Sequence, residues 1–282
     1  MRLNPFDASK INVGGGGGGF PGGAGGGIGC GTIAIALVAA LVFGVDPAAM
    51  LGGLQQSGPV ATQEQGSPQS AQELCTANEY ATESCNALQS LDETWQPAFA
   101  AAGIPFKQPR LWFISGGGVN TACGPGSSAM GPFYCPADQT IYIDTAFYDQ
   151  MARQLGAQGD FARYYVIAHE YGHHIQTLTG VASQIRSVQS QNPQAANQLQ
   201  VRMELQADCY AGVWAGKNRN LIEPGDFEEG MTAASAIGDD NLTGGRVSAE
   251  NFTHGTSAQR SEALRAGIQS ADDTVCDRYV QI

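Results

Sequence analysis

The sequence predicts an α+β domain that is mainly helical, contains a small sheet and is preceded by one transmembrane helix. Three observations support this fold class: an uncharged apolar stretch near the amino terminus, short β-branched and aromatic runs between residues 110 and 144, and long segments of helical periodicity around those runs. With 282 residues and 43% apolar composition, the chain can build a real core.

The amino-terminal quarter divides into three parts. Residues 1–27 include INVGGGGGGFPGGAGGG, and because glycine at this density cannot bury a core, they are expected to form a disordered tail. Residues 28–45 are uncharged and just long enough to cross a bilayer as a helix, with a secretory signal peptide as the alternative. Residues 46–72 are rich in Gln, Ser, Gly and Pro, which predicts a flexible linker and a folded domain over 73–282.

Charge and cysteines predict the compartment. Arg2 and Lys10 precede the apolar stretch and the next basic residue is Lys107, so the positive-inside rule predicts a single-pass protein of the cytoplasmic membrane with an extracytoplasmic domain. Six of the seven cysteines follow the stretch, an even number that suits disulfides outside the cytosol. They allow about fifteen pairings. The favoured set is Cys75 with Cys85, Cys123 with Cys135, and Cys209 with Cys276.

The folded domain is predicted to run helix, sheet, helices. Residues 73–103 have helical spacing and end at Gly103. The runs RLWFIS, PFYC and TIYID predict short strands, separated by glycine-rich turns. Further helices are expected over residues 145–157, 160–180, 192–218, 224–240 and 257–269.

The motif HEYGH predicts a zinc site. His169 and His173 are four residues apart, so on a helix both imidazoles share one face and can bind one Zn²⁺. Glu170 points elsewhere and is suited to take a proton from the attacking water as a general base. A lone helical histidine is more often a core residue, but two neutral imidazoles buried without a ligand would be costly.

A catalytic zinc needs a third protein ligand. Glu204 is expected to supply it, while Asp208, one turn further on, accepts the remaining N–H of a ligand histidine. The alternative is that these acids only solvate a helix face, although their neighbours Leu205 and Cys209 are apolar. Thr179 stands where the metzincin pattern would have its third histidine, so that pattern is absent.

The segments HEYGHH, RMELQADCYAGVW and FTHGTSAQR, with the glycine-rich tail and apolar stretch, resemble the bacterial neutral zinc metallopeptidases over nearly the whole chain. The resemblance implies a zincin-like, membrane-anchored peptidase that acts on peptide or protein substrates. It agrees with His169, His173 and Glu204 as ligands and with Glu170 as the base. It does not supply a particular substrate.

Other positions carry weaker predictions. His254 is a candidate hydrogen-bond donor to the oxyanion, or else a loop histidine with local contacts. His174 lies about 100° around the helix from His173 and is expected outside the ligand set. Gly172 suggests close approach of a substrate or a second helix. TIYID, residues 140–144, is the candidate edge strand for an extended substrate, with an ordinary buried strand equally favoured.

The net charge of −12 excludes a nucleic-acid partner, because binding phosphate backbones needs clustered Lys and Arg. The metal motif and the resemblance make zinc-dependent peptide hydrolysis the leading function. One alternative is a non-catalytic binding or scaffolding module of the cell envelope that zinc stabilises. The presence of Glu170 favours the enzyme, since a scaffold does not need the base. Hydrolysis of a non-peptide amide, such as a cell-wall bond, stays open.

Overall fold

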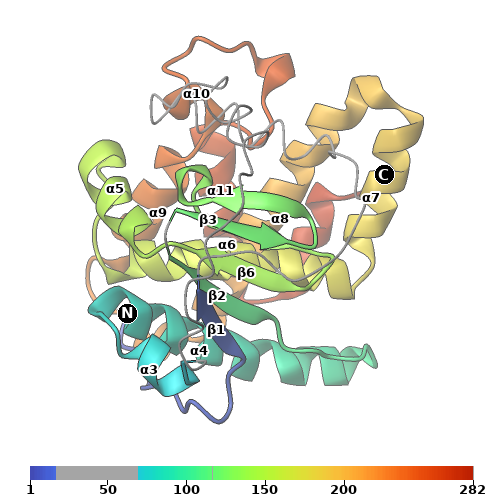
Figure 1. The fold of residues 1–282 in the computed structure, drawn as a ribbon. Helices are drawn as coiled ribbons and strands as arrows, with labels where there is room; N and C mark the ends of the chain where they lie inside the picture. The colour runs from blue at the N-terminus through green and yellow to red at the C-terminus, as the bar shows by residue number, and fades with distance from the viewer. Residues whose placement is uncertain (17–68, 116, 282) are drawn as a thin grey trace, which may run out of the picture.

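The computed structural model describes residues 1–16, 69–115 and 117–281. These parts form the mainly helical α+β arrangement that the sequence predicts (Figure 1). The strands are β1 (Val13–Gly16), β2 (Arg110–Ile114), β3 (Gly118–Thr121), β4 (Gly124–Ser127), β5 (Phe133–Cys135) and β6 (Thr140–Ile143). The α-helices are α3 (Ala71–Cys75), α4 (Glu79–Ala102), α5 (Ala146–Leu155), α6 (Asp160–Leu178), α7 (Val181–Gln191), α8 (Ala196–Lys217), α9 (Asp226–Ala236), α10 (Asp239–Leu242) and α11 (Ser257–Ser270).

The main sheet has the strand order β1-β2-β6-β5. Strands β1, β2 and β6 run parallel, and β5 pairs antiparallel with β6. Strand β6 is thus an inner strand with all four residues buried, so of the two alternatives for TIYID the ordinary buried strand is confirmed and the edge strand is wrong. β5 occupies that outer position. The glycine-rich segment expected to form turns contains the antiparallel pair β3–β4.

Residues 1–16 belong to the fold, so the prediction of a disordered tail over 1–27 is wrong for this part. The side chains of Met1, Leu3 and Ile11 are buried in the main hydrophobic core. Strand β1 then pairs with β2, where Figure 1 shows the two side by side. The domain predicted over 73–282 therefore lacked its first strand.

The glycines that suggested disorder allow close packing instead. A Cβ atom on Gly14 would lie 2.6 Å from the Trp112 ring, and one on Gly15 would lie 2.6 Å from the Leu74 side chain. A larger residue at either position would push β1 away from its neighbours. At these two positions the lack of a side chain is required for β1 to pack closely against its neighbours.

The predicted transmembrane helix, residues 28–45, lies outside the described residues, as does most of the linker over 46–72. Residues 71–72 of that linker are already in α3. Within the described ranges, no helix combines the length and the apolar character that a membrane crossing needs.

The favoured cysteine pairing is confirmed. Disulfides join Cys75 to Cys85, Cys123 to Cys135, and Cys209 to Cys276. The first two close short loops, as expected. The third ties α8 to the 3₁₀ segment Asp273–Tyr279 near the end of the chain.

Helix α6 is the structural centre, because it packs against α4, α8 and α9 and contacts β5 and β6. Helix α8 in turn packs so closely against α11 that the backbones of the two helices are in contact. A Cβ on Gly212 would lie 2.1 Å from the carbonyl oxygen of Leu264, and one on Gly267 would lie 2.1 Å from that of Cys209. Helices α6, α8 and α11 are thereby fixed relative to one another.

A buried carboxyl group links α4 to α6. Asp92 is 4% exposed, and its Oδ1 accepts a hydrogen bond of 2.7 Å from the Tyr171 hydroxyl, while Oδ2 has no hydrogen-bond partner among the described residues. Burial raises the pKa of Asp92 to about 7. The folded protein therefore binds this proton more tightly than the unfolded chain does.

This raised pKa predicts a fall in stability as pH rises. The free energy of unfolding should decrease between pH 4 and pH 7 by up to about 1.4 kcal/mol per unit from this group, because only the unfolded chain ionises freely there. We expect Asp92→Asn to remove that decrease. Urea unfolding of both proteins at pH 5 and pH 8 measures it, and an equal wild-type-to-variant difference at the two pH values would contradict it.

Candidate metal centre

Three predicted ligands converge between α6 and α8. His169, His173 and Glu204 each offer a ligand atom, and these atoms all lie within 4.8 Å of one another. The Glu204 Oε2 atom is 3.1 Å from His169 Nε2 and 3.5 Å from His173 Nε2. Because His169 and His173 are four residues apart on α6, both imidazoles lie on the helix face that α8 covers.

The other nitrogen of each imidazole is already engaged. His169 Nδ1 is 2.8 Å from Asp208 Oδ1, and His173 Nδ1 is 2.9 Å from Gln176 Oε1. Both acceptors take an N–H, so Nε2 is the nitrogen that each ring turns toward Glu204 and, once it has lost its proton, the one that can bind a metal ion. Asp208 thus occupies the position predicted for it. The sequence did not indicate Gln176, which α8 holds through the Met203 carbonyl oxygen.

The donor set fits a zinc ion. Two imidazoles and one carboxylate are typical of catalytic zinc sites. Zinc–ligand bonds of about 2.0–2.1 Å at tetrahedral angles place ligand atoms about 3.3 Å apart. The separations of 3.1 and 3.5 Å lie on either side of that value. The three residues can therefore hold the ion with small movements of their side chains.

Asp208 is the centre of a buried network behind His169. Burial raises its pKa, but the charges of Arg260 and His169 outweigh this effect and lower the pKa to about 2, so the side chain is ionised. Arg260 Nε donates to Oδ2 at 2.7 Å and Nη2 donates to Oδ1 at 2.9 Å. The Tyr165 hydroxyl also donates to Oδ1, at 2.6 Å.

Sequence reasoning did not single out Arg260, although it lies in the segment FTHGTSAQR. Its side chain is 1% exposed and comes from α11, far along the chain from α6 and α8. An ion pair between an arginine and a carboxylate cannot be recognised from sequence spacing when the two residues lie on separate helices. The signal available in the sequence was the arginine itself, because the chain has few basic residues and an arginine that becomes buried is rarely left without a partner.

Gly172 answers one question that the sequence left open. A Cβ atom at this position would lie 2.8 Å from both the Cα atom and the carbonyl oxygen of Ala207 on α8. The glycine therefore permits close approach of a second helix, the one that carries Glu204.

We expect Gly172→Ala to separate α6 from α8. Overpacking of this kind costs about 1–3 kcal/mol of stability. Because Glu204 then moves away from both histidines, zinc affinity should fall by about tenfold or more, the scale of lost supporting contacts at metal sites. Chelator competition measures the affinity, with the exposed change Ser183→Ala on α7 as control. Unchanged affinity in Gly172→Ala would show that the helix spacing is not limiting.

His254 lies in a loop that a single carboxylate organises. Asp239 Oδ2 accepts the backbone N–H groups of Thr253, His254 and Gly255, at 2.7, 2.6 and 3.1 Å. Its Oδ1 is 3.1 Å from His254 Nδ1. The loop packs on α8, since a Cβ on Gly255 would be 3.6 Å from the Leu205 side chain. Burial raises the pKa of Glu204, but His173 and His169 outweigh this effect and His254 adds a smaller contribution, so the pKa lies well below its usual range.

His174 is buried and lies outside the ligand set, as expected. Its Nε2 donates to the Lys107 carbonyl oxygen at 2.7 Å, so Nδ1 accepts from the Tyr134 hydroxyl at 3.0 Å. Burial lowers the pKa of His174 to about 4, which keeps the ring neutral. This histidine joins α6 to the outer strand β5.

A second acidic group among the described residues, formed by Asp160, Asp226 and Glu229, also has its oxygens close together. The Met1 ammonium group lies 3.0 Å from Asp160 and 2.8 Å from Asp226. Glu229 accepts the N–H of Phe161 at 3.1 Å. These acids already have partners of their own, and we do not assign a metal to them.

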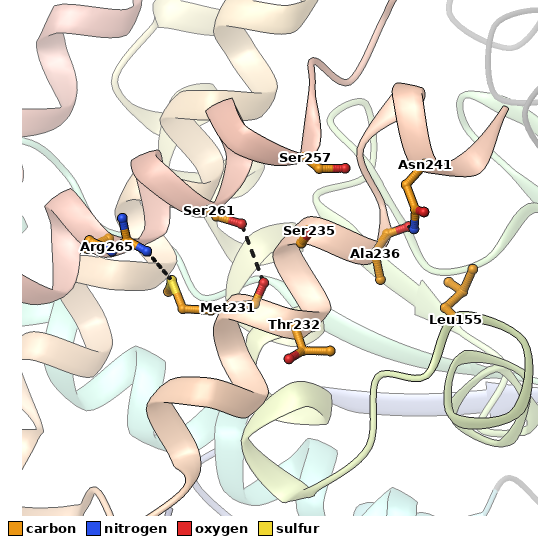
Figure 2. A pocket seen from close by; sticks show the side chains of 9 residues that line it. All are labelled: Leu155, Met231, Thr232, Ser235, Ala236, Asn241, Ser257, Ser261 and Arg265. Atoms are coloured by element: carbon orange, nitrogen blue, oxygen red, sulfur yellow. Dashed lines mark hydrogen bonds between the residues drawn. The ribbon is translucent and has the colours of Figure 1, made fainter. Parts of the chain in front are cut away.

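A pocket of about 450 Å³ lies between α9, α10, α11 and the end of α5 (Figure 2). Thr232, Ser235, Ser257 and Ser261 contribute hydroxyl groups to its wall. No His, Cys, Asp or Glu lines it, so it offers no set of metal ligands. None of the predicted site residues faces it.

Comparison with known proteins shows the family of this chain. Residues 6–279 match the family described as "Putative neutral zinc metallopeptidase". The chain belongs to this family. The "Uncharacterized protein YpfJ" of Escherichia coli K12 is 44% identical over 274 residues, which cover 95% of this chain and 91% of that protein. The "Uncharacterized protein Rv2575" of Mycobacterium tuberculosis H37Rv is 38% identical over 261 residues, 85% of each chain.

No solved structure matches this member of the family, so the zincin-like fold stays a prediction. The family resemblance itself is confirmed. The matched region begins at residue 6, before β1, and so includes part of the docked amino-terminal segment as well as the metal centre.

Proposed function

We propose that this protein is a zinc-dependent endopeptidase that hydrolyses peptide bonds in peptide or protein substrates. The observation that carries the proposal is the convergence of His169, His173 and Glu204 beside Glu170, with Asp208 behind the first ligand. A zinc that serves only stability is usually enclosed by four protein ligands, whereas three leave a position for chemistry. This difference favours an enzyme over a scaffolding module.

When bound there, Zn²⁺ would polarise the substrate carbonyl group and lower the pKa of a water molecule. Glu170 lies on the same helix as the histidines and is 8% exposed, so little bulk water competes for its carboxylate. It takes the proton of the attacking water and passes it to the leaving amine. Asp208 fixes the His169 ring, and Arg260 keeps Asp208 ionised and in place.

His254 is proposed to stabilise the oxyanion. Because Nδ1 is engaged by Asp239, Nε2 is the ring nitrogen left to contact the negative oxygen. We expect His254→Ala to lower kcat by about 10²–10³ with little change in KM or zinc content, since the contact forms only in the transition state. Steady-state kinetics and zinc analysis check this. Lost zinc would make His254 a ligand, and an unchanged kcat would make it structural.

The proposal as a whole is tested by incubating the zinc-loaded protein with a complex peptide mixture. Mass spectrometry should find new peptide termini that are absent after treatment with Glu170→Gln. A folded, zinc-bound wild type that generates none would favour the scaffolding alternative. Cleavage of isolated cell-wall material with no peptide cleavage would instead favour amide hydrolysis of that kind.

We further propose that the domain works outside the cytoplasm and is attached to the cytoplasmic membrane through residues 28–45. The three disulfides support an oxidising compartment, because such bonds rarely persist in a reducing cytosol. The uncharged sequence of residues 28–45 supports the attachment.

A further inference from the structure

The segment Met1–Gly16 is attached to the domain along its whole length. The segment ends in β1, whose residues pair with β2 from Val13 onward. Hydrogen bonds precede that pairing: Arg2 N donates to Leu221 O at 2.7 Å, Phe6 N to Asn86 Oδ1 at 2.9 Å, Asp7 N to Gln89 Oε1 at 2.6 Å, and Gln108 Nε2 to Lys10 O at 2.9 Å. Helix α4, the loop before α9 and the sheet all take part.

The domain depends on this segment in return. The Asp226 side chain is 5% exposed, and the ammonium group of Met1 lies 2.8 Å away. Without that cation, the Asp226 carboxylate would stay buried without its ion-pair partner. Removal of the segment would also leave β2 without its outer neighbour and open the core around Leu3 and Ile11.

The basic residues that predicted a cytoplasmic amino terminus have local partners. Arg2 Nη2 lies 2.5 Å from a carboxylate oxygen of Glu223, next to α9. Lys10 lies 4.0 Å from Asp7 within the segment. Both basic residues are thus exposed side chains on the surface of the folded domain.

We infer that Met1–Gly16 and the metal centre lie on the same side of the membrane. The chain leaves the domain after Gly16 and rejoins it by Gln69, so both ends of residues 17–68 are on one domain. One apolar stretch that crossed the bilayer once would put those ends on opposite faces. A return crossing needs a second such stretch, and the flanking sequences, rich in Gly or in Gln, Ser and Pro, do not supply one.

The single-pass orientation predicted from Arg2 and Lys10 is then not adopted. This inference does not depend on peptidase activity, because it concerns only which parts of the chain share a compartment.

Single-cysteine labelling of the full-length chain in spheroplasts tests the inference. Cys30 takes part in none of the three disulfides and is first replaced by Ser. Ser9→Cys then places a thiol on the exposed part of the segment, and Ser190→Cys places one on exposed α7. Each variant is treated with a membrane-impermeant maleimide before and after the membranes are opened with detergent.

We expect both thiols to be labelled in intact spheroplasts. Protection of both until detergent is added would still support the same-side inference, while contradicting the extracytoplasmic location. Labelling of one thiol with protection of the other would overturn the inference. Hydrogen exchange of the purified full chain gives a second measurement: protected amides are expected in β1, and exchange at the rate of an unfolded peptide would overturn the docking.

Discussion

Glu170→Gln is expected to lower peptide hydrolysis by about 10²–10⁴-fold while zinc content and thermal stability stay unchanged. The amide has nearly the same shape as the carboxylate but cannot accept the proton of the attacking water. Because Glu170 is 8% exposed, no nearby bulk water replaces it efficiently as a base. The measurement is kcat on a substrate identified with the wild-type protein.

Glu170→Asp is the matched control, since it keeps a carboxylate and shortens its reach by one methylene group. Activity between those of wild type and Glu170→Gln would identify proton transfer as the lost step. A Gln variant that hydrolyses at the wild-type rate would remove Glu170 from the mechanism. Loss of zinc together with activity would instead assign this residue to metal binding.

Glu204→Ala is expected to have the largest effect on the metal. The change removes one of three ligands and leaves the buried imidazole of His169 and the half-buried one of His173 without their carboxylate partner, so zinc affinity should fall by more than about 100-fold, beyond the loss typical for a supporting residue. Elemental analysis after dialysis against a competing chelator measures it. The wild type should retain one zinc ion per chain, and Glu204→Ala none.

The exposed change Glu228→Ala, on α9, controls for the loss of one negative charge. It should bind zinc as the wild type does. A Glu204→Ala protein that retains zinc at full affinity would refute this ligand assignment and direct attention to His254, the histidine of the loop that Asp239 organises.

The ligand set could be predicted because its spacing is local. His169 with His173, and Glu204 with Asp208, are each four residues apart, and a helix turns such spacing into a shared face. The disulfides were predictable for a similar reason, since two of them close short loops. In these cases the sequence separation itself limits the geometry.

Contacts between distant segments could not be predicted in this way. Asp239 organises the His254 loop, and Arg260 reaches Asp208 from another helix, but no periodic pattern connects those positions. The docked amino terminus misled for a different reason. Gly14 and Gly15 have the composition of a disordered tail, while the feature that makes them ordered is the aromatic ring of Trp112 and the side chain of Leu74, far along the chain.

The Cys209–Cys276 bond has a practical consequence for sample handling. Cys209 directly follows Asp208, the acceptor that orients the His169 ring, and both sulfur-bearing residues are buried. A dithiol reductant in the purification buffer would therefore act on this protein in two ways. It would compete with the protein for zinc, and it would reduce the Cys209–Cys276 bond and so loosen the turn of α8 that carries Asp208. Inactivation by such a buffer should not be read as chelation alone. A metal chelator without thiols, followed by zinc add-back, separates the two routes.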